Sequence, residues 1–197
     1  MKRTTRISML ILACAALTLG VAACGGDDNN GTTTTAAGTE LTLNGQDTTL
    51  ALNPATAQVL KENKVKVAPI APATASDAGI SFPITGGQVN SDTLAGKIDH
   101  SGGLKFSAGG KDVELTDFVV DTTAGTLTAK TGGADLVTLD LDLTGLGKTT
   151  EGDVIVATGI TSGLTVEAAN ALNEAFSVKL FKKGIPMGKV TVRATGS

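Results

Sequence analysis

The sequence predicts a mainly β domain: an antiparallel β-sandwich or partly closed barrel of about ten strands with two short α-helices. Runs in which apolar and polar residues alternate recur from Glu40 to the end of the chain. Glycine-rich pairs separate many of these runs, and only two stretches combine a capping residue with helical spacing. Short strands at this spacing are typical of sandwiches and barrels.

The first 23 residues have the pattern of a signal peptide. Basic residues 1–6 precede an apolar run, residues 7–20, that is short for a membrane span. The run leads into Val21-Ala22-Ala23-Cys24, which indicates a bacterial lipoprotein signal with Cys24 as the lipidated residue; the alternative is an ordinary cleaved signal. Residues 24–39 are small and polar, as in a flexible tether. We therefore expect residues 40–197 to form a domain anchored to the cell membrane on its extracytoplasmic face.

The first part of this domain is expected to alternate short strands with turns. Asn44-Gly45 lies between two alternating runs and predicts a hairpin. Asn53 and Pro54 are expected as the N-cap and first residue of a helix ending near Asn63. A strand at 64–67, a proline-rich connector at 68–78 and a strand at 79–84 follow. Pro83 predicts that this last strand lies at an edge of the sheet or that Pro83 lies at a strand end, and Gly86-Gly87 predicts a turn.

Residues 94–121 hold the densest alternation, with turns expected at Gly102-Gly103 and Gly109-Gly110. Phe118 and Val120 have the opposite parity from Val113 and Leu115, which predicts a bulge or two-sided burial near Asp117.

The C-terminal part is expected to complete the sheet with strands at 126–130, 135–143, 153–158, 177–181 and 189–194. In the second of these, the inward set is Val137, Leu139, Leu141 and Leu143, and the outward set is Thr138, Asp140 and Asp142. Thr165 is expected to cap a helix over residues 166–176, with a buried face made by Ala168, Ala169, Leu172 and Phe176.

Charge and composition exclude several classes of function. The chain has 16 basic and 19 acidic residues, and loss of Lys2, Arg3 and Arg6 with the signal leaves 13 and 19, a net charge of −6. A net-acidic chain without a basic cluster is a poor partner for nucleic acid. The domain has no disulfide, because Cys14 leaves with the signal and Cys24 carries the lipid. The absence of Trp and Tyr disfavours sugar sites and many haem sites.

The residues that could carry chemistry are few. His100 is the only histidine, with no second ligand at metal-binding spacing and no nucleophile motif. Its phase with Ile98 predicts a partly buried ring hydrogen-bonded to backbone; the alternative is contact with a ligand. Asp140 and Asp142 share a strand face and could hold Ca²⁺, but they also fit a solvated face. We predict no catalytic residue and no metal site.

Three segments together resemble the HtaA-type domain family: residues 94–121, residues 164–176, and Gly184-Ile185-Pro186-x-Gly188. The family pattern G-x-V-x-F/H-x-G-x-L-x-F falls on Gly96 to Phe106, and its following L-T-D/S-F/P strand falls on Leu115 to Phe118. The resemblance implies the family's fold and export from an actinobacterial cell, and several members bind haem. Those members coordinate iron through a tyrosine supported by a histidine in a G-H-x-G turn. This chain has no tyrosine, and residues 107–110 (SAGG) replace the turn, so the haem site does not carry over.

These observations lead to one expected function and one alternative. We expect a non-enzymatic domain without a cofactor that binds an apolar small ligand or a surface protein, with His100, Phe106 and Phe118 as ligand-binding residues. The alternative is haem binding with His100 or Met187 as the iron ligand. A hydrolase would need a polar cleft with perturbed carboxyl groups. A purely structural protein would have no concave pocket of ligand size.

Overall fold

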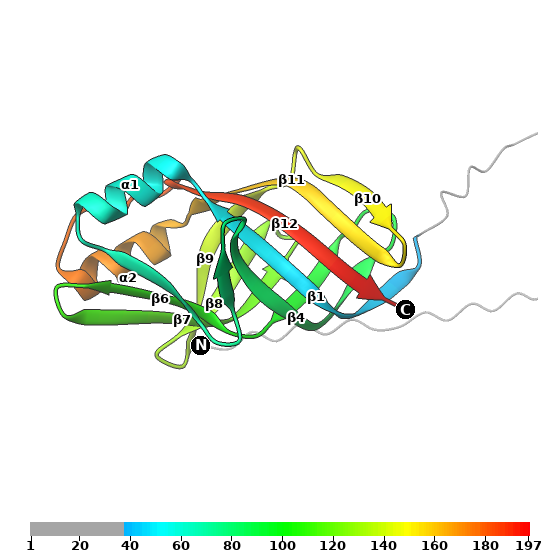
Figure 1. Cartoon of the computed structure of the whole chain (residues 1–197), viewed down its shortest axis with the longest axis horizontal. Coiled ribbons are helices and arrows are strands. Elements are labelled where there is room, and N and C mark those ends of the chain that lie inside the picture. Colours follow the sequence, from blue (N-terminus) through cyan, green and yellow to red (C-terminus); the bar gives the residue numbers. More distant parts are fainter. Residues whose placement is uncertain (1–37) are drawn as a thin grey trace, which may run out of the picture. The chain divides into compact units, whose positions relative to one another are not determined.

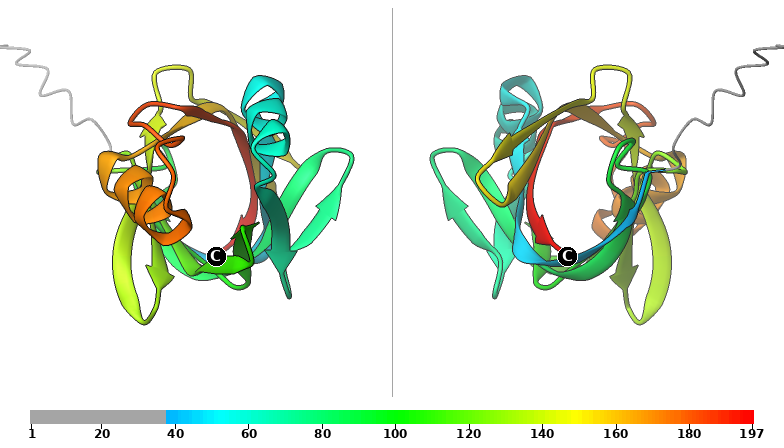
Figure 2. Two further views of the ribbon diagram at one scale, coloured as in Figure 1. Left: turned by 90° about the vertical axis from the view of Figure 1, so that its left-hand side faces the viewer. Right: turned by 90° about the vertical axis from the view of Figure 1, so that its right-hand side faces the viewer.

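The computed structural model describes residues 38–197, so the predicted signal peptide, Cys24 and most of the predicted tether lie outside the described residues. Eight strands close into an antiparallel barrel (Figures 1 and 2). In chain order these are β1 (Glu40–Leu52), β4 (Gly79–Asn90), β5 (Gly96–His100), β7 (Lys111–Asp121), β8 (Thr126–Thr131), β9 (Ala134–Asp142), β11 (Val154–Leu164) and β12 (Pro186–Gly196). Around the barrel they run β7-β5-β4-β1-β12-β11-β9-β8, and β8 pairs back with β7. The predicted mainly β fold is therefore confirmed, in its barrel form.

Four further strands extend the sheet outside the ring. β6 (Gly103–Ala108) pairs with β7, and β2 (Lys66–Ile70) pairs with β6. β3 (Thr74–Ser76) pairs with β4, and β10 (Gly147–Glu151) pairs with β11. The sequence analysis missed β3 and β10. Among the described residues no helix has both the length and the apolarity that a membrane crossing needs.

Both helices form where their caps predicted. α1 (Pro54–Glu62) begins after Asn53, whose side chain accepts the N–H groups of Ala55 and Thr56. α2 (Val166–Phe176) begins after Thr165, whose hydroxyl accepts the N–H of Ala168. The two helices flank one end of the barrel (Figure 2). This end, together with the turn between β6 and β7, is called the helical end below.

The helices differ in how firmly they are packed. α2 buries the four side chains that the sequence predicted, whereas α1 buries only Thr56 and Leu60. The core fills the barrel with aliphatic side chains around Phe82 and Phe118, whose rings meet edge to face at 5.0 Å. α1 is therefore attached to this core by much less apolar surface than α2.

Register shifts explain one success and two failures of the sequence analysis. The bulge predicted near Asp117 is confirmed: the β7–β8 register shifts between Thr116 and Val119, and Asp117 has φ +50°. The Asn44-Gly45 hairpin is wrong, because β1 continues through a bulge there and pairs with β12 on both sides of it. The turn at Gly86-Gly87 is also wrong, because β4 continues with a register shift after Ile84. Glycines inside long strands here make bulges rather than turns.

Pro83 lies neither in an edge strand nor at a strand end, contrary to prediction, since β4 has neighbours on both sides and continues to Asn90. On one side β4 pairs with β3 as far as Ser81 and with β5 from Ile84 onward. Pro83 falls between these two ladders, so its missing N–H interrupts neither of them.

The facing of β9 was predicted only in part. Leu139 and Leu141 point inward and Asp140 and Asp142 are exposed, but Thr138 is buried and Val137 is 39% exposed. The β8–β9 register shifts between Leu127 and Thr128, which reverses the parity of the strand's first half.

Candidate functional site

An apolar groove lies at the helical end, between α1 and residues 180–187. Its volume is about 230 Å³. The lining consists almost wholly of apolar atoms, contributed by Ala55, Thr56, Val59, Leu60, Leu180, Phe181, Ile185, Pro186 and Met187. Val59 is 42% exposed there, a large fraction for a valine beside a core. An exposed apolar hollow of this kind is a common feature of binding sites.

One wall of the groove is α1, which is held by few contacts. The hydroxyl of Thr56 donates to the carbonyl of Pro186 at 2.6 Å, and the N–H of Asn53 donates to the carbonyl of Met187 at 2.9 Å. Leu60 is the one large side chain that the helix buries. On its other side α1 borders a second hollow, of about 390 Å³, to which Leu60, Lys61 and Lys64 contribute. Little apolar area would be lost if α1 shifted to admit a ligand.

The opposite wall owes its shape to Asn173 of α2. The Asn173 amide donates to the carbonyl of Phe181 at 2.8 Å and accepts the Phe181 N–H at 2.9 Å. These two bonds satisfy the backbone of Phe181 in place of a neighbouring strand. Residues 177–181 therefore do not form the predicted strand, and the correction matters because Leu180 and Phe181 both line the groove.

A second, smaller cavity lies inside the barrel. It measures about 40 Å³, and the surface it exposes is apolar. Phe106 and Phe118, two of the predicted ligand-binding residues, line it and are 2% and 4% exposed. Met187 lines both this cavity and the external groove. Met187, which has a flexible side chain, is thus the residue common to the linings of the two spaces.

His100 is buried with both ring nitrogens engaged. Nδ1 lies 3.1 Å from the Phe118 carbonyl, and Nε2 lies 2.6 Å from the Thr48 hydroxyl. The carbonyl only accepts, so Nδ1 carries the proton and Nε2 accepts from Thr48. Burial lowers the pKa of His100 below its ordinary value of 6.5, while the Phe118 carbonyl and the charge of Asp99 act in the opposite direction. The interpretation of His100 as a buried histidine bonded to backbone fits this geometry.

Thr48 and His100 have the spacing of a nucleophile and its general base. However, the side chains are 5% and 6% exposed, and Thr48 faces the interior cavity of about 40 Å³. A substrate carbonyl could not reach the hydroxyl without opening the barrel. The pair is therefore a buried polar bridge between β1, β5 and β7.

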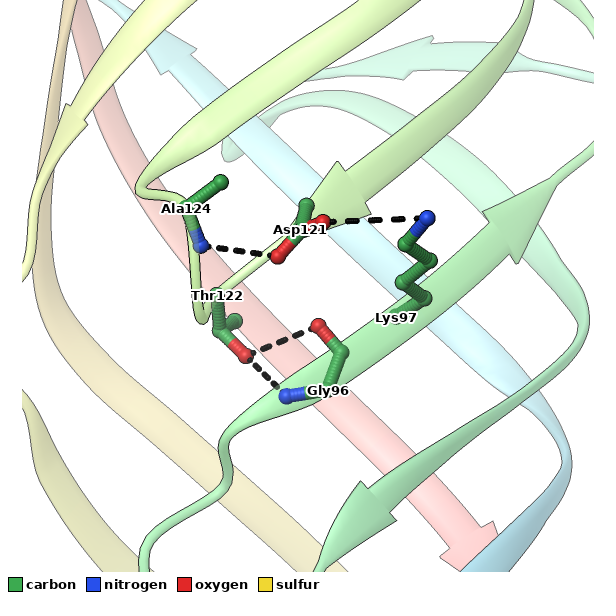
Figure 3. Close-up of polar contacts among 5 residues, drawn as sticks. All are labelled: Gly96, Lys97, Asp121, Thr122 and Ala124. Carbon is green, nitrogen blue, oxygen red and sulfur yellow. Dashed lines mark hydrogen bonds and ion pairs between the residues drawn. The ribbon is translucent and has the colours of Figure 1, made fainter. Parts of the chain in front are cut away.

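A polar groove of about 470 Å³ runs over β5, β7 and β8 on the outside of the barrel. Figure 3 shows one end of it, where Asp121 accepts the N–H of Ala124 and lies 3.8 Å from Lys97. The hydroxyl of Thr122 bridges to Gly96 and fixes β5 beside β7. Although the groove is acidic, residues 38–197 contain no group of three or more side chains placed to hold a metal ion.

Asp140 and Asp142 line a different open groove, of about 640 Å³, on β9, β11 and β12. Asp142 accepts both the hydroxyl and the N–H of Thr144, and these bonds lower the pKa of its carboxyl group. Local bonding therefore accounts for Asp142, and the two carboxylates fit the solvated strand face that the sequence analysis gave as the alternative to calcium.

Neither a protein-family model nor a curated protein sequence matches this chain. Among solved structures, the C-terminal domain of HtaA from Corynebacterium glutamicum is similar over 80% of this chain and 99% of its own, with a TM-score of 0.59 and 12% identity. The N-terminal domain of the same protein covers 82% of this chain and 99% of its own, with a TM-score of 0.55 and 16% identity. The domain therefore has the fold of HtaA domains, which confirms the resemblance at the level of the fold.

Sequence reasoning found only part of this arrangement. Phe106 and Phe118 both line the interior cavity, and His100 is hydrogen-bonded to Thr48, which also lines that cavity. None of these three predicted residues lines the external groove. Of the residues that the sequence analysis named as candidates for ligand or iron binding, only Met187 lines this groove. Val59 and Phe181 were missed, because the sequence pattern of neither stretch indicates the groove that the two residues line together.

Proposed function

We propose that this chain is a lipid-anchored, non-enzymatic binding protein of the extracytoplasmic membrane face, whose HtaA-like barrel binds an apolar small ligand in the groove between α1 and residues 180–187. The groove itself supports this most directly: an apolar hollow bounded by a lightly attached helix. A narrow hollow fits a small ligand better than the flat face of a protein partner.

The geometry of β1 is consistent with the proposed anchor. Gly38 lies where the chain enters the barrel, with its carbonyl accepting from Asn90. From there β1 runs 13 residues to Leu52 beside α1, a length of about 40 Å at ~3.3 Å per residue. The described chain therefore enters the barrel at the end opposite to the groove.

Binding of an uncharged apolar dye, Nile red, to the purified protein tests the proposal. We expect saturable fluorescence enhancement at one site. Val59→Asp should abolish it, because a carboxylate would then sit against the apolar lining. Val166→Asp is the matched control: Val166 is 43% exposed, on the other helix and outside the groove. Equal loss in both variants, or no saturable binding, would refute a site in this groove.

Haem is the second candidate, and Met187 is the observation that favours it, since its thioether is beside the groove. The residues present do not fit haem held through His100, because both ring nitrogens are already bonded within the protein. Titration with haemin decides between the ligands: a Soret shift at one equivalent that is lost in Met187→Ala and kept in His100→Asn would establish haem. No shift, together with Nile red binding, would leave the first proposal.

A further inference from the structure

We propose that the ligand of the groove is a single-chain anionic amphiphile of the long-chain fatty acid class. Its acid group lies among the lysines beside the groove, and its chain passes Met187 toward the interior of the barrel. This inference rests on the proposed function and names the chemistry of its ligand.

The charge distribution at the helical end favours a negatively charged ligand. Residues 38–197 contain 13 basic and 17 acidic residues, a net charge of −4. Nevertheless, six of the 13 lie on the two segments beside the groove: Lys61, Lys64, Lys66, Lys179, Lys182 and Lys183. Over residues 61–66 and 177–185, the one acidic residue is Glu62, which accepts the amide of Gln58.

These lysines are also free to meet a ligand. All six are exposed, and none takes part in the ion pairs of the described residues, which involve Lys97, Lys105 and Arg193. Lys61, Lys64 and Lys66 line the hollow on one side of α1. Lys182 and Lys183 lie between Phe181 and Ile185, which line the groove on the other side. Exposed lysines on the two segments beside the groove, in a domain that is otherwise negatively charged, attract an anion and repel a cation.

The size of the apolar spaces favours a ligand with a single alkyl chain. The groove of about 230 Å³ and the interior cavity of about 40 Å³ are each smaller than the ~300–1,000 Å³ of sites for compact, drug-sized ligands. Met187 lines both spaces, and its unbranched side chain has three rotatable bonds. A narrow alkyl chain can extend from one space into the other past Met187, whereas a broad rigid ring system cannot.

Fluorescence of cis-parinaric acid, a polyene fatty acid, measures this directly, and the lack of Trp and Tyr keeps the protein background low. Unlabelled fatty acids and fatty alcohols of equal length then compete with the probe. We expect the acid to bind at least about fivefold more tightly than the alcohol, since several lysines contribute weakly each. Affinity should rise by up to about fourfold per added CH₂ until the path past Met187 is filled.

Two sets of variants separate the head-group and chain contributions. The triple change Lys64→Gln, Lys182→Gln and Lys183→Gln should remove the preference for the acid and leave alcohol binding unchanged. The matched control is Lys97→Gln, Lys130→Gln and Lys148→Gln, three exposed lysines of β5, β8 and β10; it should keep the preference. Met187→Phe should stop the gain with chain length at a shorter chain, because the ring narrows the passage.

The outcomes distinguish this inference from the proposal beneath it. Equal affinity for acid and alcohol, or an equal effect of both lysine sets, overturns the anionic head group. No gain with chain length, or the same gain in Met187→Phe, overturns the path into the barrel. In each of these cases Nile red binding still reports a groove site; if Nile red binding also fails, the proposed function itself is wrong.

Discussion

Protonation of His100 should destabilise the fold between pH 8 and pH 5.5. The ring is buried, so its pKa is lowered from 6.5 in the folded protein, mainly by desolvation. Because the unfolded chain then binds a proton more readily than the folded one, stability is fully present above pH 6.5. It is lost as the pH falls from there toward the folded pKa.

The size of the effect follows from linkage. With an unfolded pKa of 6.5 and a lowered pKa in the folded protein, the free energy of unfolding drops by up to about 1.4 kcal/mol between pH 8 and pH 5.5. A change in stability over this pH range can be attributed to His100, because it is the only histidine in the sequence. Asp112 and Asp142 have lowered pKa values, from an ordinary 3.8, so their contributions are lost only at lower pH.

Urea unfolding followed by far-UV circular dichroism at several pH values measures the drop. His100→Asn is the informative variant: its amide can still donate to the Phe118 carbonyl, but it does not titrate. The variant should lose about 1–3 kcal/mol through the unpartnered Thr48 hydroxyl and should show no pH dependence over this range. A drop of the same size in the variant, or a flat profile in the wild type, would refute the linkage to His100.

Three further changes should alter stability by amounts that the same unfolding assay resolves. Leu172→Ala removes a side chain that is 2% exposed and should cost about 2–5 kcal/mol; a cost under ~1 would mean that α2 is not packed as described. Thr165→Ala should cost about 0.5–2 kcal/mol through loss of the cap to the Ala168 N–H, and Thr165→Ser should restore most of it. Gly96→Ala should prevent stable folding, because at φ +153° the new methyl group would meet the β4 backbone. Gly132→Ala, at φ +56° in open space, should cost only about 1–2 kcal/mol, and equal costs at the two glycines would contradict the tight β4–β5 approach.

Features with local causes were predictable from the sequence. Both helices begin at their caps because the caps satisfy N–H groups within the next three residues. The bulge at Asp117 was visible because a change of parity is a property of one strand. Closure of the barrel was not visible, since it depends on the pairing of β7 with β8 and on partners far along the chain. For the same reason Asn44-Gly45 failed as a hairpin: β4 and β12 hold β1 extended on both sides of it.

The candidate site depends on a contact that alternation cannot reveal. Val178 and Leu180 alternate with polar residues and suggest a strand, yet Leu180 and Phe181 both line the groove, which consecutive strand residues cannot do on one face. The segment is not a strand because the Asn173 side chain makes hydrogen bonds to both the N–H and the carbonyl of Phe181. The segment can therefore turn without a neighbouring strand. The groove then needs α1, more than 100 residues earlier, to supply the other wall. The site is formed by a segment that the Asn173 side chain fixes and by a helix, α1, that few contacts hold. Neither stretch alone has a sequence pattern that indicates the site, because only the folded barrel brings Val59, Phe181 and Met187 together.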